Sequence, residues 1–86
     1  MPEISRFFGM TITMHYEDHN PPHFHVRHGD KIALIDIRTG ALLKGVLSPK
    51  ALGLVVEWCF RHRAELLENW ELAKRHGTLR KVDPLE

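Results

Sequence analysis

Cysteine is nearly absent from this sequence: Cys59 is the only one, so no disulfide can form within the chain. A lone cysteine that follows Val55 and Val56 and lies between Trp58 and Phe60 is most simply a small buried apolar residue. A reactive thiol is the alternative interpretation. The lack of a disulfide framework is typical of a reducing compartment, and we therefore expect a cytoplasmic protein.

Long apolar runs are missing as well. No uninterrupted stretch approaches the roughly 20 residues with which a helix crosses a bilayer. The first ten residues include Glu3 and Arg6 and contain no apolar segment of signal-peptide length. We therefore expect no membrane contact and no targeting segment.

A strong charge of either sign is also lacking. The formal net charge is +1, so the basic footprint of many nucleic-acid-binding domains is absent. In the C-terminal third the basic residues alternate with acidic ones, a pattern typical of a solvated helix face. No helix-turn-helix pattern supports direct DNA binding. The composition leaves nucleic acid open as a partner without favouring it.

The length of 86 residues allows one domain with a thin core. Domains of this size often depend on a metal, a disulfide or a partner for stability, and a homo-oligomer is one such solution. We expect a single domain over residues 1–86, with a strand-rich part (4–47), a helical part (49–76) and a tail (78–86). The tail is expected to become ordered only by docking onto something.

The first half of the chain has the pattern of a small β-sheet. Apolar and polar residues alternate there, which predicts half-buried strands, and proline or glycine separates the segments. The expected strands cover residues 8–15, a segment that begins near His23, residues 32–38 and residues 42–47. Gly29 and Asp30 are expected to form a tight hairpin turn, and Gly45 a bulge.

Helical spacing begins at Ser48 and Pro49. A serine can cap the free amides of the first turn, and a proline at the first helical position loses no hydrogen bond. Apolar residues then recur every three or four positions. The apolar face is weakest between Arg61 and Arg63, which predicts either one long, bent helix or two consecutive helices.

Together these elements predict an α+β fold, with a small antiparallel sheet of three to four strands and the C-terminal helix or helices packed on one face. Gly53, inside the helical segment, indicates a place where the helix packs close to the sheet. Trp58 and Trp70 are twelve residues apart and do not share one helix face. Core packing is the favoured interpretation, and the alternative is that one of them is an exposed anchor for a partner.

Histidine is the one residue type in clear excess. Five of the seven histidines fall within fourteen residues: His15, His19, His23, His25 and His28. If residues 29–30 form a two-residue turn, antiparallel pairing places His25 opposite Leu34 and His23 opposite Asp36. These histidines and Asp36 then share one face of the sheet.

A metal site is the first function that suits this cluster. Two histidines that are two residues apart on a strand point to the same face. A third histidine or a carboxylate would complete a three-ligand site for zinc or another transition metal. The candidate ligands are His15, His23, His25 and Asp36, with Asp18 as a further ligand or as a hydrogen-bond acceptor behind them. His15 joins the cluster if the first predicted strand pairs with the second.

Acid–base catalysis without a metal is the second function. His23 and His25 would serve as acid and base, because histidine titrates near neutral pH. Asp36 or Asp18 would orient them. Arg27 would stabilise anionic charge, as on RNA or another phosphoester.

Recognition is the third function, and a purely structural role stands beside it. The candidate binding residues are Asp18, His19, Asn20, His23 and His25. In the structural interpretation, His23 fixes the backbone of the proline loop and His25 is a half-exposed residue of the sheet. The residues by themselves leave these alternatives open.

Four segments of the sequence resemble one bacterial family. They are the opening Pro2–Gly9, the proline loop with its strand at Asp18–Val26, the segment Ile35–Gly40, and the helical Trp58 with Glu65–Trp70. The family is catalogued only as domain of unknown function 4160. The resemblance covers nearly the whole chain, and the proline loop is its most specific part.

The resemblance implies a partner more than it implies a chemistry. Members of the family are small stand-alone proteins without an established activity, often encoded beside another small protein in an arrangement similar to toxin–antitoxin pairs. The resemblance also implies a site at the positions shared with the family, which are His19, Asn20, Pro21, Pro22, His23 and His25. We therefore expect a small interaction module that acts with a co-encoded partner in a toxin–antitoxin-like or regulatory unit. The alternative is a histidine-based or metal-dependent hydrolase that acts on RNA or another phosphoester.

Overall fold

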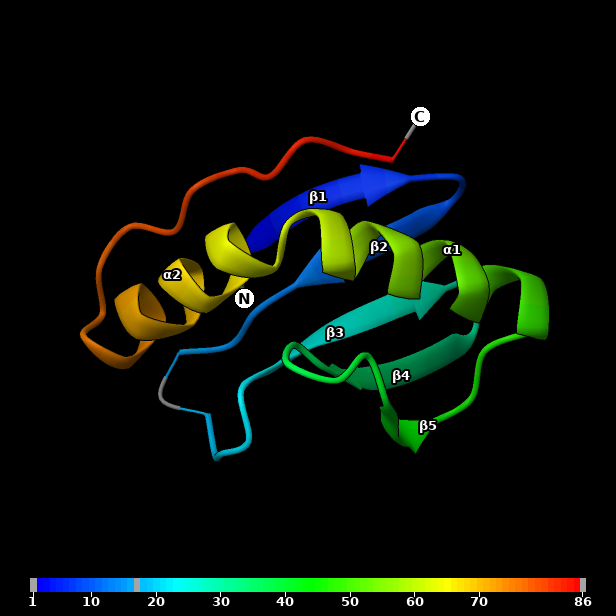
Figure 1. The fold of residues 1–86 in the computed structure, drawn as a ribbon, viewed down its shortest axis with the longest axis horizontal. Coiled ribbons are helices and arrows are strands. Elements are labelled where there is room, and N and C mark those ends of the chain that lie inside the picture. Colours follow the sequence, from blue (N-terminus) through cyan, green and yellow to red (C-terminus); the bar gives the residue numbers. More distant parts are fainter. Residues whose placement is uncertain (1, 17, 86) are drawn as a thin grey trace.

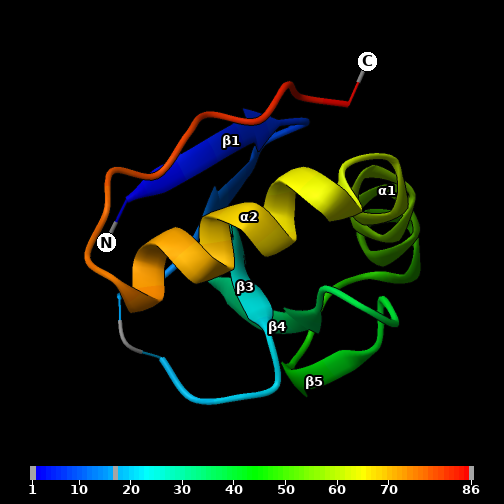
Figure 2. The ribbon, with the colours of Figure 1, turned by 60° about the vertical axis from the view of Figure 1, so that its left-hand side comes forward.

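The computed structural model describes residues 2–16 and 18–85 and shows one antiparallel sheet with two helices (Figure 1). The elements are β1 (Glu3–Phe7), β2 (Met10–Thr13), β3 (His23–His28), β4 (Lys31–Asp36), β5 (Leu42–Gly45), α1 (Pro49–Arg61) and α2 (Arg63–Lys74). The strands lie side by side in chain order, from β1 to β5. Both helices cover the same face of the sheet (Figures 1 and 2). The α+β class is therefore confirmed, with five strands in place of the expected three to four.

The strand that the sequence did not reveal is β1. Its side chains do not alternate cleanly, because Ile4 and Ser5 are both buried and the pairing with β2 shifts between Glu3 and Ser5. The expected strand over residues 8–15 is in fact a turn followed by β2. Phe8 and Gly9 form this turn with positive φ angles of 49° and 77°.

The register of the central hairpin agrees with the two-residue turn expected at residues 29–30. His23 pairs with Asp36, and His25 pairs with Leu34. On its other side β3 pairs with β2, where Thr13 lies opposite His25. This pairing brings the chain that follows β2 alongside the histidines of β3.

Strand β5 is short and irregular. Its pairing with β4 shifts between Leu34 and Ile35, whose partners are Lys44 and Leu42. Gly45 has a positive φ of 86°, and a Cβ atom there would lie 2.0 Å from the carbonyl oxygen of Ile32, so only glycine fits. All four residues of β5 are exposed.

The helices begin and break where the sequence indicates. The Ser48 Oγ accepts a hydrogen bond from the Ala51 backbone N–H at 3.2 Å, and the helical segment breaks at His62 into two consecutive helices. No helix within the described ranges combines the length and apolarity that a membrane crossing requires.

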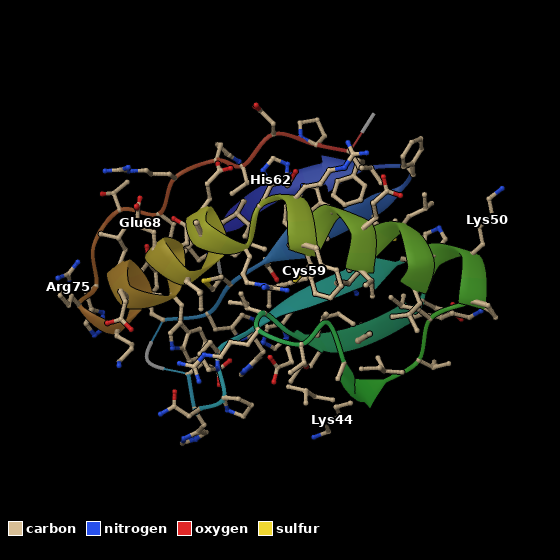
Figure 3. All side chains as sticks on the ribbon, viewed as in Figure 1. Lys44, Lys50, Cys59, His62, Glu68 and Arg75 are labelled. Carbon is tan, nitrogen blue, oxygen red and sulfur yellow. The ribbon has the colours of Figure 1, made fainter. Side chains whose placement is uncertain are left out.

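The core lies between the helices and the sheet. Cys59, on α1, points into this layer and is fully buried (Figure 3). Trp58 and Trp70 are both buried, so the core interpretation is confirmed and neither tryptophan is an exposed anchor. The Trp58 indole N–H donates to the carbonyl oxygen of Asp83 at 2.7 Å.

The C-terminal tail runs beside β1 (Figure 2). The Val82 N–H donates to the Ile4 carbonyl at 2.8 Å. The Asn69 side chain, on α2, donates to the Arg80 carbonyl and accepts from the Arg80 N–H, both at 2.9 Å. Val82 and Leu85 are buried. The tail therefore docks onto its own domain and needs no partner to become ordered.

Gly53 is exposed, and a Cβ atom there would meet nothing within 4 Å, so the expected close packing on the sheet is wrong.

We predict that Gly53→Ala raises the free energy of unfolding by about 1 kcal/mol, because alanine loses less backbone entropy in a helix. Urea denaturation measures this value. Gly45→Ala, with its clash and positive φ, should lower stability, and a fall in stability for Gly53→Ala would contradict the prediction.

Candidate functional site

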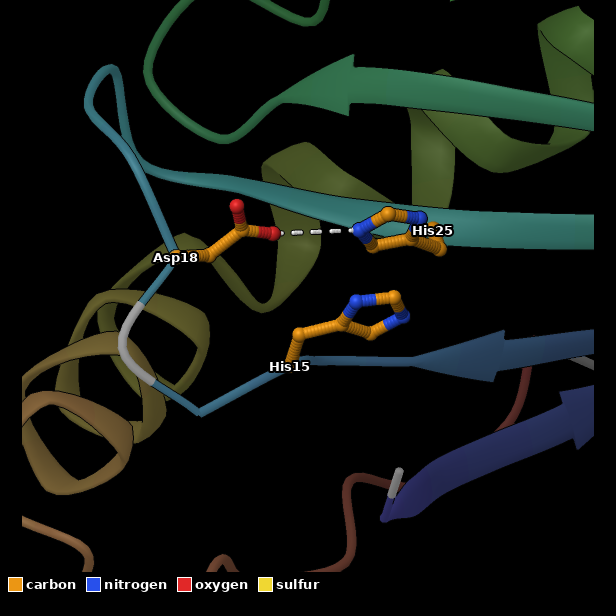
Figure 4. Close-up of side chains that lie close together, drawn as sticks. All are labelled: His15, Asp18 and His25. Carbon is orange, nitrogen blue, oxygen red and sulfur yellow. Dashed lines mark hydrogen bonds and ion pairs between the residues drawn. The ribbon is translucent and has the colours of Figure 1, made fainter.

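A cluster of three histidines and one aspartate lies where β2 and β3 meet the proline loop. His15 follows β2, Asp18 belongs to the loop, and His23 and His25 belong to β3. The Asp18 Oδ2 atom lies 3.0 Å from the His23 Nε2 and 3.3 Å from the His25 Nε2. Figure 4 shows Asp18 reaching across to His25, with the ring of His15 alongside. One carboxylate thus joins two imidazoles.

His23 is the buried anchor of the cluster, with a relative exposure of 5%. Its Nδ1 lies 2.7 Å from the carbonyl oxygen of Pro21, while its Nε2 faces Asp18. Each ring nitrogen thus faces an oxygen atom, one from the loop backbone and one from the Asp18 carboxylate. The ring also contacts Trp70 of α2, with the centroids 5.3 Å apart. His23 therefore fixes the loop and holds Asp18.

The carboxylate of Asp18 is held at both oxygens. Its Oδ1 accepts a hydrogen bond from the His19 backbone N–H at 2.9 Å, and its Oδ2 faces His23 and His25. Burial acts to raise the pKa of Asp18, but the hydrogen bonds from His19, His25 and His23 outweigh it and leave the pKa below its ordinary value. Asp18 is therefore ionised at neutral pH.

His15 and His25 stack face to face. Their ring centroids are 3.7 Å apart and the planes differ by 5°. Burial lowers the pKa of His15, the neighbouring His25 lowers it further, and Asp18 opposes both effects. The ring of His15 is therefore mainly neutral at neutral pH, and one of its two nitrogens has a lone pair available for a metal or a proton.

The structure places Asp18, and not the carboxylate of Asp36, against the histidines. Asp36 pairs with His23 in the sheet as expected. Its Oδ1, however, accepts the backbone N–H groups of Arg38 at 2.7 Å and Thr39 at 3.1 Å. The side chain of Asp36 closes the turn after β4, which accounts for its burial without a role in the cluster.

The other candidate residues are divided between a groove and the loop. The helices leave one face of the sheet uncovered (Figure 1). A groove of about 470 Å³ lies beside the cluster. It is lined by Arg6, Thr11, Thr13, His15, His25, Val26, Arg27 and Ile32. Arg27 is exposed there, close to the cluster. His19 and Asn20 are exposed in the loop, and His19 contributes its backbone N–H.

Sequence reasoning missed two features of this site. Arg6 lines the groove, but its place could not be seen because β1 was not predicted. The stacking of His15 on His25 depends on the route of the chain after β2. The only available signal was the condition that the first predicted strand pairs with the second, which the structure fulfils.

Cys59 is no part of the site. Its Sγ lies 3.4 Å from the carbonyl oxygen of Ile37, and burial raises the pKa of the thiol to about 11. The interpretation as a small buried apolar residue is confirmed.

We predict that Cys59 resists alkylation in the folded chain at pH 8, because only roughly a thousandth of the thiol is ionised and the sulfur is covered. Iodoacetamide labelling followed by mass spectrometry measures the rate. The chain unfolded in urea is the control and should label fast. Equal rates in the two states would contradict the prediction.

The fold and the cluster define a class of small α+β domain, in which a meandering sheet carries helices on one face and a histidine–aspartate cluster at the end of the other. The family model described as Domain of unknown function (DUF4160) matches residues 9–71, well over half of the 86 residues. The chain belongs to this family. Comparison with curated proteins and with solved structures gave no match.

Proposed function

We propose that this chain is a small interaction module that works with a co-encoded partner protein in a toxin–antitoxin-like or regulatory unit, and that the partner covers the open face of the sheet beside β5. The single observation that supports this is the unequal protection of the two sheet edges. The tail lies along β1, whereas the outer edge of β5 has no neighbouring strand within the described residues.

Apolar side chains gather at the unprotected edge. Ile32, Leu42, Leu43 and Val46 have relative exposures of 49, 40, 43 and 57%. Large apolar groups clustered on a surface mark interaction sites more often than scattered ones do. An unpaired strand edge also offers backbone donors and acceptors to an added strand.

The charges near these four apolar side chains indicate which kind of partner surface would fit. Arg27 pairs with Ile32, and Lys44 pairs with Leu34, so both cations belong to the open face. Figure 3 shows Lys44 projecting away from the helices. The complementary surface is an apolar strand or ridge bordered by acidic residues.

We predict that the chain and its co-encoded neighbour, expressed together without tags, elute as one complex in size-exclusion chromatography at micromolar concentration. Ile32→Asp should weaken the complex at least tenfold, because it places a charge among these apolar side chains. Phe60→Asp is the matched control, since Phe60 is equally exposed, at 47%, but lies on α1.

Two separate peaks for the wild-type pair would overturn the proposal. So would an equal loss of binding in both variants. The peak is also checked for nucleic acid by its absorbance at 260 nm. If nuclease treatment removes both this absorbance and the complex, the partner is a nucleic acid and not a protein.

A second candidate function is hydrolysis of RNA or another phosphoester by a histidine-based or metal-dependent mechanism. The supporting observation is that His25 and its acceptor Asp18 adjoin a groove that also presents Arg27 and Arg6. An imidazole that is held by a carboxylate can serve as acid or base in catalysis. The two guanidinium groups suit an anionic phosphoester.

We predict for this candidate that His23→Ala and His25→Ala, alone and combined, abolish any nucleolytic effect on a labelled RNA while circular dichroism still shows a folded chain. His28→Ala is the control, because His28 pairs with Met10 and so projects to the core side of the sheet. Full cleavage by the folded double variant would exclude a histidine-based mechanism at this site.

A further inference from the structure

Three side chains from separate segments come together at one end of the open face. His15 follows β2, Asp18 comes from the loop and His25 from β3 (Figure 4). Each offers one ligand atom, and these atoms all lie within 4.8 Å of one another. All three residues are partly buried, and two of them, His15 and His25, line the groove.

The spacing of two of these atoms already suits a metal. The Asp18 Oδ2 and the His25 Nε2 are 3.3 Å apart. Two ligands of a tetrahedral zinc, each bound at about 2.0–2.1 Å, are separated by about 3.3 Å. A bound cation would take the place of the proton that His25 directs at the carboxylate.

The carboxylate is also supported from behind. The His19 backbone N–H holds its Oδ1, and His23, itself fixed by the Pro21 carbonyl, contacts its Oδ2. Hydrogen bonds of this kind orient ligating carboxylates and raise metal affinity 10–100-fold, by order of magnitude. His23 is therefore a positioning residue for Asp18.

His15 requires one rearrangement. Its ring is parallel to that of His25 at a centroid distance of 3.7 Å, and parallel stacked rings do not direct their nitrogen lone pairs at a common point. A rotation of the His15 side chain would turn the stack into a converging pair. Metal binding should therefore separate the two rings.

We propose that His15, Asp18 and His25 form a three-ligand site for a divalent transition metal such as zinc, with a fourth position open to the groove. Two imidazoles and one carboxylate are a donor set that zinc and its neighbours accept. This set takes Asp18 in place of Asp36, and it keeps His23 as a support and not as a ligand. The inference is independent of the partner proposal.

The test is a titration of the tag-free, chelator-treated full chain with Zn²⁺ by calorimetry, and with Co²⁺ by visible absorption. We expect one metal per chain. His15→Ala and Asp18→Asn should each weaken binding more than about 100-fold, whereas His23→Gln should weaken it only about tenfold. His28→Ala, outside the set, is the matched control and should bind like the wild type. Circular dichroism shows whether each variant is folded.

Metal should also shift the ring nitrogen resonances of His15 and His25 and leave those of His28 unchanged. This readout uses the wild-type chain and so holds even where a variant fails to fold. Absence of one-to-one uptake, or equal losses in His15→Ala and His28→Ala, would overturn the site. Because binding is read directly, a failed RNA cleavage assay with a loaded site would exclude hydrolysis of that RNA and leave the metal site standing.

Discussion

The pleat of strand β3 is the constraint on which the rest of this structure depends. Successive side chains of a strand point to opposite faces, so the buried Phe24 and Val26 determine that His25 and Arg27 face the open side. The turn at Gly29, with its positive φ of 64°, fixes the register against β4. A slip of one residue would expose the core and bury the charges, so the position of the polar cluster is set by the same contacts that stabilise the fold.

Local patterns in the sequence were enough for those parts of the fold that local chemistry decides. The two-residue turn, the register of His23 with Asp36 and the weak point of the helical segment near His62 could all be predicted, since each depends on neighbouring residues. Strand β1 could not, because its shifted pairing hides the alternation of side chains. For Trp70 the sequence favoured burial over exposure but could not decide between them, because burial depends on contacts with a strand that is distant in the sequence.

In the candidate site, too, some features follow from the local sequence and others depend on the path of the chain. Strand periodicity places His23 and His25 together, but it cannot say which carboxylate meets them. Asp36 lies in the right register, yet the turn after β4 uses its oxygen. Asp18 reaches the histidines only because of the path of the proline loop, which no periodic pattern describes. The open face thus carries the polar cluster at one end, and the exposed Ile32 and Arg27 line the same groove as His15 and His25.

The docking of the tail on β1 has a consequence for the order in which the domain is completed. Lys81 donates to the carbonyl oxygen of Glu3, a contact that spans 78 positions of the chain. Contacts that join distant segments form late, because the entropy of closing the intervening loop is lost before they stabilise anything. During synthesis, the outer edge of β1 therefore stays open until the residues beyond 80 have been made. For that interval a sheet that had already formed would have two unprotected edges, and each could pair with a strand of another chain.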